Sequence, residues 1–314
     1  MYRWTRVLSR RNRRILMVKL SIRLTNIDLK HPIMNASGVM GNSVESIVKL
    51  IKSNVSAVVT KTLTLERREG YSTPVLIPLE YGLLNAIGLA NPGIDSLYEF
   101  VKIVKKHNLP VIASISGRNI NEYVESTIKA LDAGVDGLEL NMSCPHTLDY
   151  RVDSIETIRE ITSSVKSICS KPIWVKLSYS RELIRETGVA LESGADAVVL
   201  INTIPGMVID IYVSKPVLSN KYGGLSGPAI HPIAIYCIYS IYREYGCEII
   251  GAGGIVDWKT AIETIQAGAR ALQLATAFYM KGYGVVNEIL KGIEKYMVEN
   301  NINSIDELIG LAHS

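Results

Sequence analysis

The chain has 314 residues, of which 47% are hydrophobic and 20% are charged. That length and apolar content allow a large buried core and exclude an intrinsically disordered chain. The formal net charge of +4 arises at one end, because residues 1–14 carry six arginines and no acid, whereas the rest of the chain has 28 basic and 30 acidic residues. The body of the protein is therefore not expected to be a nucleic-acid-binding surface.

The arginine-rich start, residues 1–16, is expected to be a disordered arm or a misassigned start, with an amphipathic surface anchor as the alternative. It lacks the apolar core of a signal peptide, and no apolar run approaches the roughly 20 residues that a membrane span needs. We therefore expect a cytoplasmic protein in which residues 17–314 form a single domain.

The spacing of the four cysteines argues against a zinc site and against a disulfide framework, because it contains no C-x-x-C pair. They are Cys144, Cys169, Cys237 and Cys247. We expect no bound metal, whereas a single reactive thiol is compatible with this spacing.

From Pro32 onward, short β-branched runs alternate with amphipathic stretches, and no linker, repeat or low-complexity segment divides the chain. The predicted strands are residues 32–37, 57–63, 110–115, 137–142, 173–178, 197–202, 248–252 and 271–276. Helical patterns lie between them, for example at residues 120–131, 154–168, 181–192, 230–245 and 258–266. Each crossover is long enough for parallel pairing, so the sequence predicts an α/β fold, a (β/α)₈ TIM barrel.

Two further patterns support this architecture. Glycines that directly precede predicted strands are typical of helix C-caps, and they are Gly134, Gly194 and Gly268. The insertion between the second and third strands, residues 64–93, is rich in Pro, Gly and Asn. We expect it to form a substrate-side loop region over the C-terminal face of the barrel.

Polar residues follow nearly every predicted strand, where the active site of such a barrel forms. Each also has a plainer interpretation, as a helix cap, a turn residue or a solvent-facing side chain. Lys61 and Lys176 stand out because each ends an apolar strand, where burial without an anionic partner would be costly. A bound anion is the natural inference.

The last two strands indicate what kind of anion binds. Gly253-Gly254 precedes a helix, and Thr276 occupies the matching position one strand later. Glycines let backbone N–H groups approach a phosphate closely, and the loops after strands seven and eight commonly bind phosphate in these barrels. The pattern predicts a phosphate site but does not identify the ligand.

At Asn141-Met142-Ser143-Cys144-Pro145 the sequence resembles the class 1 dihydroorotate dehydrogenases, and the resemblance extends from about Asn26 to Phe278. The other matching pieces, in the family's order and spacing, are Asn35-Ala36-Ser37-Gly38, Thr60-Lys61-Thr62, Asn85-Ala86-Ile87-Gly88-Leu89, Asn91-Pro92-Gly93, Ile201-Asn202-Thr203, Gly206-Met207, Gly223 to Pro228 and Gly253-Gly254-Ile255. Each piece alone is weak evidence, but the set is specific.

The resemblance implies an FMN-binding barrel that oxidises dihydroorotate to orotate in pyrimidine biosynthesis. The residues that it assigns to FMN are Ser37, Lys61, Thr62, Ser114, Asn141, Lys176, Ile201, Gly227, Gly253, Gly254, Ala275 and Thr276. The residues that it assigns to the substrate are Lys61, Asn85, Ala86, Ile87, Gly88, Leu89, Asn141, Asn202 and Thr203.

The chemistry of the reaction suits these residue types. Oxidation removes a proton from C5 and a hydride from C6, so a base is needed on one face of the ring and flavin N5 on the other. Cys144 is the expected base, because an ordinary thiol pKa near 8.5 needs only modest lowering. Lys176, expected near the flavin N1–C2 edge, would stabilise negative charge on the reduced ring.

Within the family, Asn85 to Leu89 followed by Asn91-Pro92-Gly93 most resembles the class 1B form, which pairs with an electron-transfer subunit that carries FAD and an iron–sulfur cluster. This chain lacks an iron–sulfur cysteine cluster and a G-x-G-x-x-G turn, so NAD would have to react at a partner. The resemblance implies a homodimer of barrels within a heterotetramer.

Three positions and one segment depart from the family's pattern. His146 and Ser114 stand where Asn is usual, Ala275 replaces a common Gly, and the segment 147–153 is shorter than the usual loop after the cysteine. These differences affect a substrate contact, the flavin side, the approach to phosphate and the closure of the loop, respectively.

Three alternatives stay open at this point. The barrel of dihydropyrimidine dehydrogenase also carries a Ser-Cys-Pro-His segment and acts on uracil, although the segment Asn85 to Leu89 favours dihydroorotate. A flavin-free phosphate-binding isomerase or aldolase is the second. A non-catalytic scaffold is the third, and the presence of Cys144, Lys61 and Lys176 together argues against it.

Overall fold

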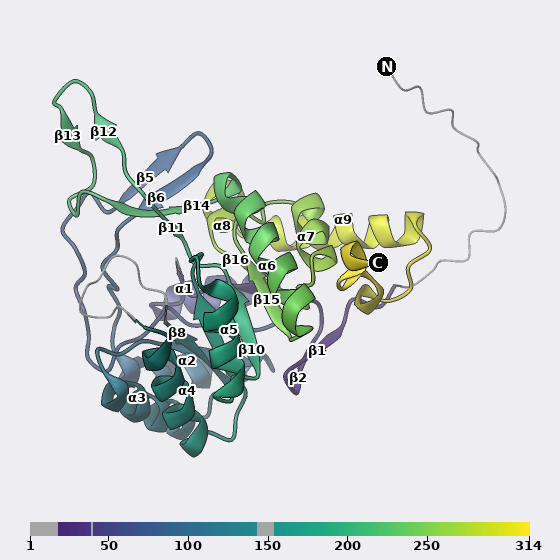
Figure 1. Ribbon diagram of the computed structural model, residues 1–314, viewed down its shortest axis with the longest axis horizontal. Coiled ribbons are helices and arrows are strands. Elements are labelled where there is room, and N and C mark those ends of the chain that lie inside the picture. Colours follow the sequence, from purple (N-terminus) through teal and green to yellow (C-terminus); the bar gives the residue numbers. More distant parts are fainter. Residues whose placement is uncertain (1–17, 39, 143–153) are drawn as a thin grey trace.

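Eight parallel strands form the centre of the computed structural model, which describes residues 18–38, 40–142 and 154–314 (Figure 1). In spatial order the strands are β3 (Ile33–Asn35), β16 (Ala271–Leu274), β15 (Ile249–Ala252), β10 (Ala197–Leu200), β9 (Ile173–Leu177), β8 (Gly137–Asn141), β7 (Val111–Ile115) and β4 (Val58–Val59). Each lies within a predicted strand. The prediction of a (β/α)₈ barrel is confirmed.

The barrel closes between β3 and β4 with the help of a side chain. The Ser56 N–H donates to the Ile33 carbonyl at 2.9 Å near the start of this seam. Further along, the Asn35 side chain takes the place of a strand: its Oδ1 accepts from the Val59 N–H at 3.0 Å, and its Nδ2 donates to the Val59 carbonyl at 2.6 Å. Because Asn35 satisfies both backbone groups of Val59, β4 needs no continuous ladder to β3.

Helices surround the strands, as Figure 1 shows. They are α1 (Val44–Lys52), α2 (Leu97–Lys105), α3 (Ile120–Ala133), α4 (Ile155–Ile168), α5 (Leu183–Glu192), α6 (His231–Tyr245), α7 (Trp258–Gln266), α8 (Thr276–Lys281) and α9 (Val285–Glu299). Short 3₁₀ helices occur at Ile94–Ser96, Pro228–Ile230, Ile305–Leu308 and Leu311–His313. The five helices predicted from the sequence are all present. None of the helices in the described ranges is long and apolar enough to cross a membrane.

Local sequence accounts for several helix ends. Asn119 and Ser154 cap α3 and α4, each accepting a hydrogen bond from the backbone N–H three residues later. Gly134 ends α3 in the left-handed conformation, as predicted. Gly194 and Gly268 lie one residue beyond the C-caps of α5 and α7, again with positive φ.

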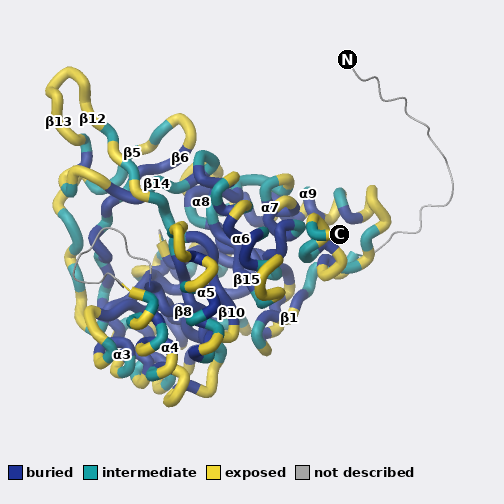
Figure 2. Tube along the Cα trace, viewed as in Figure 1, coloured by how far each residue is buried: buried dark blue, intermediate teal, exposed yellow. Residues whose placement is uncertain are grey.

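A small antiparallel sheet lies over one end of the barrel. Its strands, in order, are β11 (Ile204–Gly206), β14 (Gly223–Ser226), β6 (Gly82–Asn85) and β5 (Leu76–Leu79). The predicted insertion therefore lies over the barrel mouth, as expected, and pairs there with the segment that follows β10. Beyond it projects the hairpin of β12 (Ile209–Asp210) and β13 (Lys215–Pro216), whose exposed residues include Ile211 and Tyr212 (Figure 2).

The opposite end is closed by the hairpin of β1 (Ile22–Leu24) and β2 (Ile27–Leu29). The buried Trp174 of β9 donates its indole N–H to the Thr25 hydroxyl at the tip of this hairpin, at 2.8 Å. Two aspartates form ion pairs at the same end. Asp136 and Asp196 each accept from the backbone N–H of a strand and pair with a lysine of the helix that precedes that strand. Polar groups at this end are thus used to hold the barrel together.

Candidate active site

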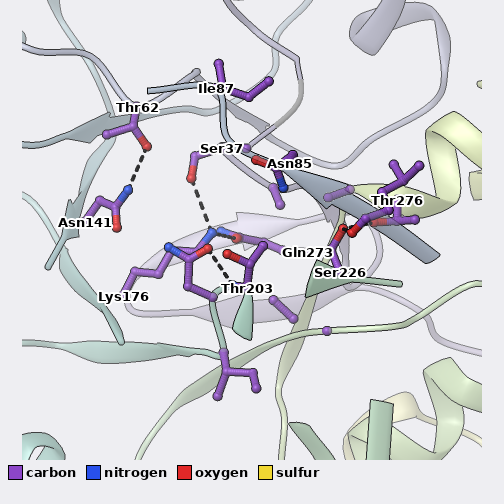
Figure 3. Close-up of a pocket in the computed structure, with 18 of the residues that line it drawn as sticks. Ser37, Thr62, Asn85, Ile87, Asn141, Lys176, Thr203, Ser226, Gln273 and Thr276 are labelled. Carbon is purple, nitrogen blue, oxygen red and sulfur yellow. Dashed lines mark hydrogen bonds between the residues drawn. The ribbon is translucent and has the colours of Figure 1, made fainter. Parts of the chain in front are cut away.

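A cavity of about 370 Å³ lies between the carboxyl ends of the barrel strands and the small sheet, a size that suits a cofactor or substrate (Figure 3). Most residues that the sequence assigned to the site line it together. They are Ser37, Lys61, Thr62, Asn85, Ile87, Gly88, Leu89, Asn141, Lys176, Ile201, Asn202, Thr203, Gly227, Gly253, Gly254, Ala275 and Thr276.

Three assigned residues are not among those that line the cavity. Ser114 is fully buried behind Thr62, whose hydroxyl lies 3.0 Å from its own, and its Oγ donates to the Glu139 carboxylate. Ala86 is buried in a small apolar cluster with Leu84 and Leu218. Cys144, the expected base, lies outside the described residues, as do His146 and the segment 147–153.

Lys176 is held at the floor of the cavity by a ring of polar groups. Its ammonium donates to the Ser37 hydroxyl at 3.3 Å and to the Gln273 Oε1 at 3.2 Å (Figure 3). The Ser37 hydroxyl donates in turn to the carboxylate of Glu139 at 2.7 Å, and the Gln273 Nε2 donates to the same carboxylate at 2.6 Å. The ammonium itself lies 3.7 Å from that carboxylate, so the sequence-based expectation of a buried lysine with an anionic partner is met partly within the protein.

The cavity wall carries positive charge. Lys61, which is 8% exposed, donates from Nζ to the Gly38 carbonyl at 2.5 Å. Lys61 and Lys176 are the ionisable side chains among the described lining residues, and no Asp or Glu of the described chain lines the cavity. Such a wall favours an anionic ligand.

Glycines at one end of the cavity form a cradle without side chains. Gly227, Gly253 and Gly254 all have positive φ, and a Cβ on Gly254 would lie 2.7 Å from the Gly227 carbonyl oxygen. Among the described residues, the N–H groups of Gly253 and Gly254 have no acceptor. Thr276 begins α8 beside them, with its hydroxyl donating to Ser226 at 2.8 Å. Unpaired N–H groups in a glycine cradle match the requirements of a phosphate.

Two amide side chains that line the cavity are each fixed by a hydrogen bond. The Asn85 Nδ2 donates to the Gly224 carbonyl at 3.1 Å, which fixes its amide between the small sheet and the cavity. The Asn141 Nδ2 donates to the Thr62 hydroxyl at 3.1 Å (Figure 3). Amides present both a donor and an acceptor, which suits a planar ligand with alternating imide groups.

Two polar residues of this site, Glu139 and Gln273, were not predicted from the sequence. Glu139 is fully buried below the cavity, and Gln273 lines it. Each interrupts an apolar strand, in Leu138-Glu139-Leu140 and Leu272-Gln273-Leu274. A polar side chain in the middle of a buried strand is the signal that could have revealed them.

The cysteines in the described ranges lie in unreactive surroundings. Burial raises the pKa of Cys237 to about 12 and that of Cys247 to about 11, and it also raises the pKa of Cys169. These thiols stay protonated near neutral pH. The described residues contain no cluster of His, Cys, Asp and Glu that could hold a metal ion.

Comparison with known proteins shows the family of this chain. The model of the family described as "Dihydroorotate dehydrogenase" matches residues 19–297. A protein named dihydroorotate dehydrogenase B (NAD(+)), catalytic subunit, from Thermoplasma volcanium is 41% identical over 299 residues, which cover 94% of this chain and 99% of that protein. Proteins of the same name from Pyrococcus abyssi (41% identity, 93% and 99% covered) and Methanothermobacter thermautotrophicus (39%, 94% and 98%) are similar to the same extent. The chain belongs to the dihydroorotate dehydrogenase family.

Proposed function

We propose that this protein oxidises (S)-dihydroorotate to orotate, a step of pyrimidine biosynthesis, with FMN as its cofactor. The observation that carries the proposal is the cavity itself, in a chain of this family. Among the described residues, its wall has a glycine cradle and two lysines but no acidic side chain. The relatives that match nearly the whole chain are named for the same reaction.

The residues of the cavity fit a flavin mononucleotide. Membership of the family implies a flavin. The cradle supports the mononucleotide form, because the N–H groups of Gly253 and Gly254, which have no acceptor in the described part of the chain, suit one phosphate. Lys176 would stabilise negative charge on the flavin ring, and Ile201 and Thr62 would line the space around it. The chemistry supplied by bound FMN is acceptance of the hydride from C6 of the substrate.

The chain's own residues supply binding and proton transfer. Lys61 would bind the substrate carboxylate, and Asn85, Asn141 and Asn202 would bind its imide groups. We assign Cys144 as the base that takes the C5 proton. The other three cysteines do not line the cavity, and burial raises the pKa of each thiol, which supports this choice.

We further propose that the barrel works with an electron-transfer subunit. The relatives are named as catalytic subunits of an NAD(+)-dependent enzyme, and a catalytic subunit implies a separate partner. The expected partner carries FAD and an iron–sulfur cluster, and two barrels would pair within a heterotetramer in the cytoplasm. Co-purification from native cells, followed by identification of any associated flavoprotein, tests this assembly.

The direct test of the reaction is anaerobic mixing of the yellow protein with dihydroorotate. Bleaching of the flavin absorbance is expected, and a wild-type protein that stays yellow with bound FMN would rule out the proposed substrate. Cys144→Ala should bind FMN normally but bleach about 10²- to 10⁴-fold more slowly, because the C5 proton then lacks its base. Wild-type bleaching rates in this variant would contradict the role of the thiol.

The same purified protein distinguishes the proposed reaction from two alternative functions. A pyrimidine-reducing enzyme would reoxidise chemically reduced flavin with uracil and would not be bleached by dihydroorotate. A flavin-free isomerase or aldolase would be colourless and would not bind added FMN. The cluster of amides and Lys61 in one cavity favours a substrate that carries both a carboxylate and imide groups over uracil.

A further inference from the structure

Glu139 is a buried acid that neither cofactor binding nor proton transfer uses. It lies on β8 with no exposed surface, and it is not among the residues that line the cavity. Taking a carboxylate out of water is costly unless partners compensate it. Its position beneath the cavity therefore calls for a functional account.

The partners of Glu139 form a closed ring with Lys176. One carboxylate oxygen, Oε1, accepts from the hydroxyls of Ser37 and Ser114 at 2.7 and 2.9 Å. The other, Oε2, accepts from the Gln273 amide at 2.6 Å. The Lys176 ammonium donates to Ser37 and Gln273, and it lies 3.7 Å from Oε1. Lys176 and Glu139 are thus joined through two bridging residues and by direct charge attraction.

The ring also fixes the orientation of its members. A carboxylate only accepts hydrogen bonds and an ammonium only donates them, so the Gln273 amide has one orientation that satisfies both neighbours. Two of the three N–H donors of Lys176 are directed into the ring, at Ser37 and Gln273. The ammonium is therefore held at one place on the cavity floor, with an opposite charge behind it.

We infer that Glu139 is a positioning residue that sets the reduction potential of the cofactor through Lys176. The inference rests on the proposed flavin site. With a flavin bound, Lys176 would attract the negative charge of the reduced ring, and the carboxylate behind Lys176 would offset part of that attraction. The pair thus holds the potential below the value that an uncompensated lysine would produce.

The first test compares Glu139→Gln with Glu139→Asp in the FMN-loaded protein. The amide has nearly the shape of the carboxylate but no charge, so reduction should become at least tenfold more favourable, a rise of about 30 mV for a two-electron couple. Glu139→Asp keeps the charge, so its reduction potential should differ from that of the wild type by less than about a third of this rise. A potential in Glu139→Gln equal to that of the wild type would overturn the inference.

The second test needs no cofactor and remains available if the first variant loses FMN. Unfolding of the apoprotein is measured for Glu139→Gln, Lys176→Met and the double variant. Each single change leaves one buried charge without its partner. The unfolding equilibrium constant of the double variant should therefore be at least tenfold smaller than the value obtained by multiplying the two single effects. Independent, multiplicative effects would overturn the inference.

The two tests separate failure of the inference from failure of the proposed function. A protein that binds no flavin contradicts the proposed function, while the apoprotein cycle still measures the coupling between Glu139 and Lys176. Normal FMN binding and bleaching by dihydroorotate, together with an unchanged potential in Glu139→Gln, would retain the function and reject the role of Glu139.

Discussion

At the carboxyl ends of the barrel strands, polar side chains face a cavity, whereas at the amino ends they bind the backbone of the barrel itself. Lys61 and Lys176 line the cavity. At the other end, Asp136 binds the Val111 N–H, and His31 accepts from the Ile33 N–H at 3.2 Å and bonds to the Asn54 carbonyl at 2.7 Å.

This difference assigns separate tasks to the two ends. The N–H groups of Gly253 and Gly254, which have no acceptor among the described residues, lie where a ligand would bind, whereas the bonded side chains of Asp136 and His31 hold the fold at the other end. Substitutions at the cavity end should therefore change FMN binding, and substitutions at the opposite end should change stability alone.

The largest effect is expected for Gly254→Ala at the cavity end. The added Cβ would lie 2.6 Å from the His231 Cβ and 2.7 Å from the Gly227 carbonyl, at a φ of +69°. FMN affinity should fall by more than tenfold, and stability by about 2–4 kcal/mol, because the strained cradle moves apart. Fluorescence titration of the apoprotein with FMN and thermal unfolding measure the two effects.

The control for this variant is Gly284→Ala, whose Cβ would meet nothing within 4 Å and whose φ of −69° suits alanine. It should bind FMN as the wild type does. If Gly254→Ala binds FMN with the affinity of the wild type, the glycine cradle is not part of the binding site. The proposed difference between the two ends of the barrel would then be wrong.

The second effect concerns the seam of the barrel. Asn35→Leu leaves the buried N–H and carbonyl of Val59 without partners, so the free energy of unfolding should fall by about 2–5 kcal/mol. Denaturant unfolding measures this. Ser56→Ala, at the same seam, should cost less than about 1 kcal/mol, since the Ile33 carbonyl keeps its bond from the Ser56 N–H. Equal losses in both variants would show that the amide bridge is not what closes the barrel.

The third effect is a pH dependence at the amino end. Burial lowers the pKa of His31 from 6.5 to about 4. The unfolded chain binds the proton more readily than the folded one, so stability is lost as pH falls from about 6.5 to about 4, by about 3 kcal/mol in total.

Replacement of His31 by Gln should flatten the curve of unfolding free energy against pH in this window. FMN affinity should not change. The exposed His107, replaced by Gln, serves as the control and should leave the curve as it is. An equally steep curve in His31→Gln would assign the acid sensitivity to other groups.

The smallest effect is expected for Asp196→Asn, also at the amino end. Asp196 accepts from the Ile173 N–H at 2.9 Å and pairs with Lys166 at 3.0 Å, but its side chain is 35% exposed. Because exposed ion pairs are weak, unfolding should become easier by less than about 1 kcal/mol. FMN binding should match the wild type, and a lower affinity would mean that the two ends are coupled.

The barrel could be predicted from the sequence because its evidence is periodic. Eight apolar runs, spaced by amphipathic stretches, leave few other folds, and each run contains the observed strand. The predicted strand at residues 57–63 was too long: β4 is only Val58–Val59. The Asn35 side chain makes hydrogen bonds to β4 that a neighbouring strand would otherwise make. Such a side-chain bridge produces no periodic pattern in the sequence.

The site was predictable only in part, for a different physical reason. Motifs located the residues that line the cavity, but barrel strands are buried on both faces, so alternation does not tell which side chains point inward. Glu139 and Gln273 were missed for that reason. The assignment of Ser114 to the cofactor stays a prediction, because Ser114 does not line the cavity and its hydroxyl donates to Glu139. The contacts among strands β3, β7, β8, β9 and β16 that build the ring exist only after the barrel has closed.

The side-chain bridge at Asn35 has a consequence for motion in the barrel wall. Val59 is bonded to a rotatable amide, so its N–H is released when one side chain turns, while the backbone ladders between the other strands stay intact. Ser37 and Lys61 follow directly on the two strands that this amide joins. Solvent exchange of the Val59 N–H should therefore depend on rotation of one side chain rather than on separation of two paired strands.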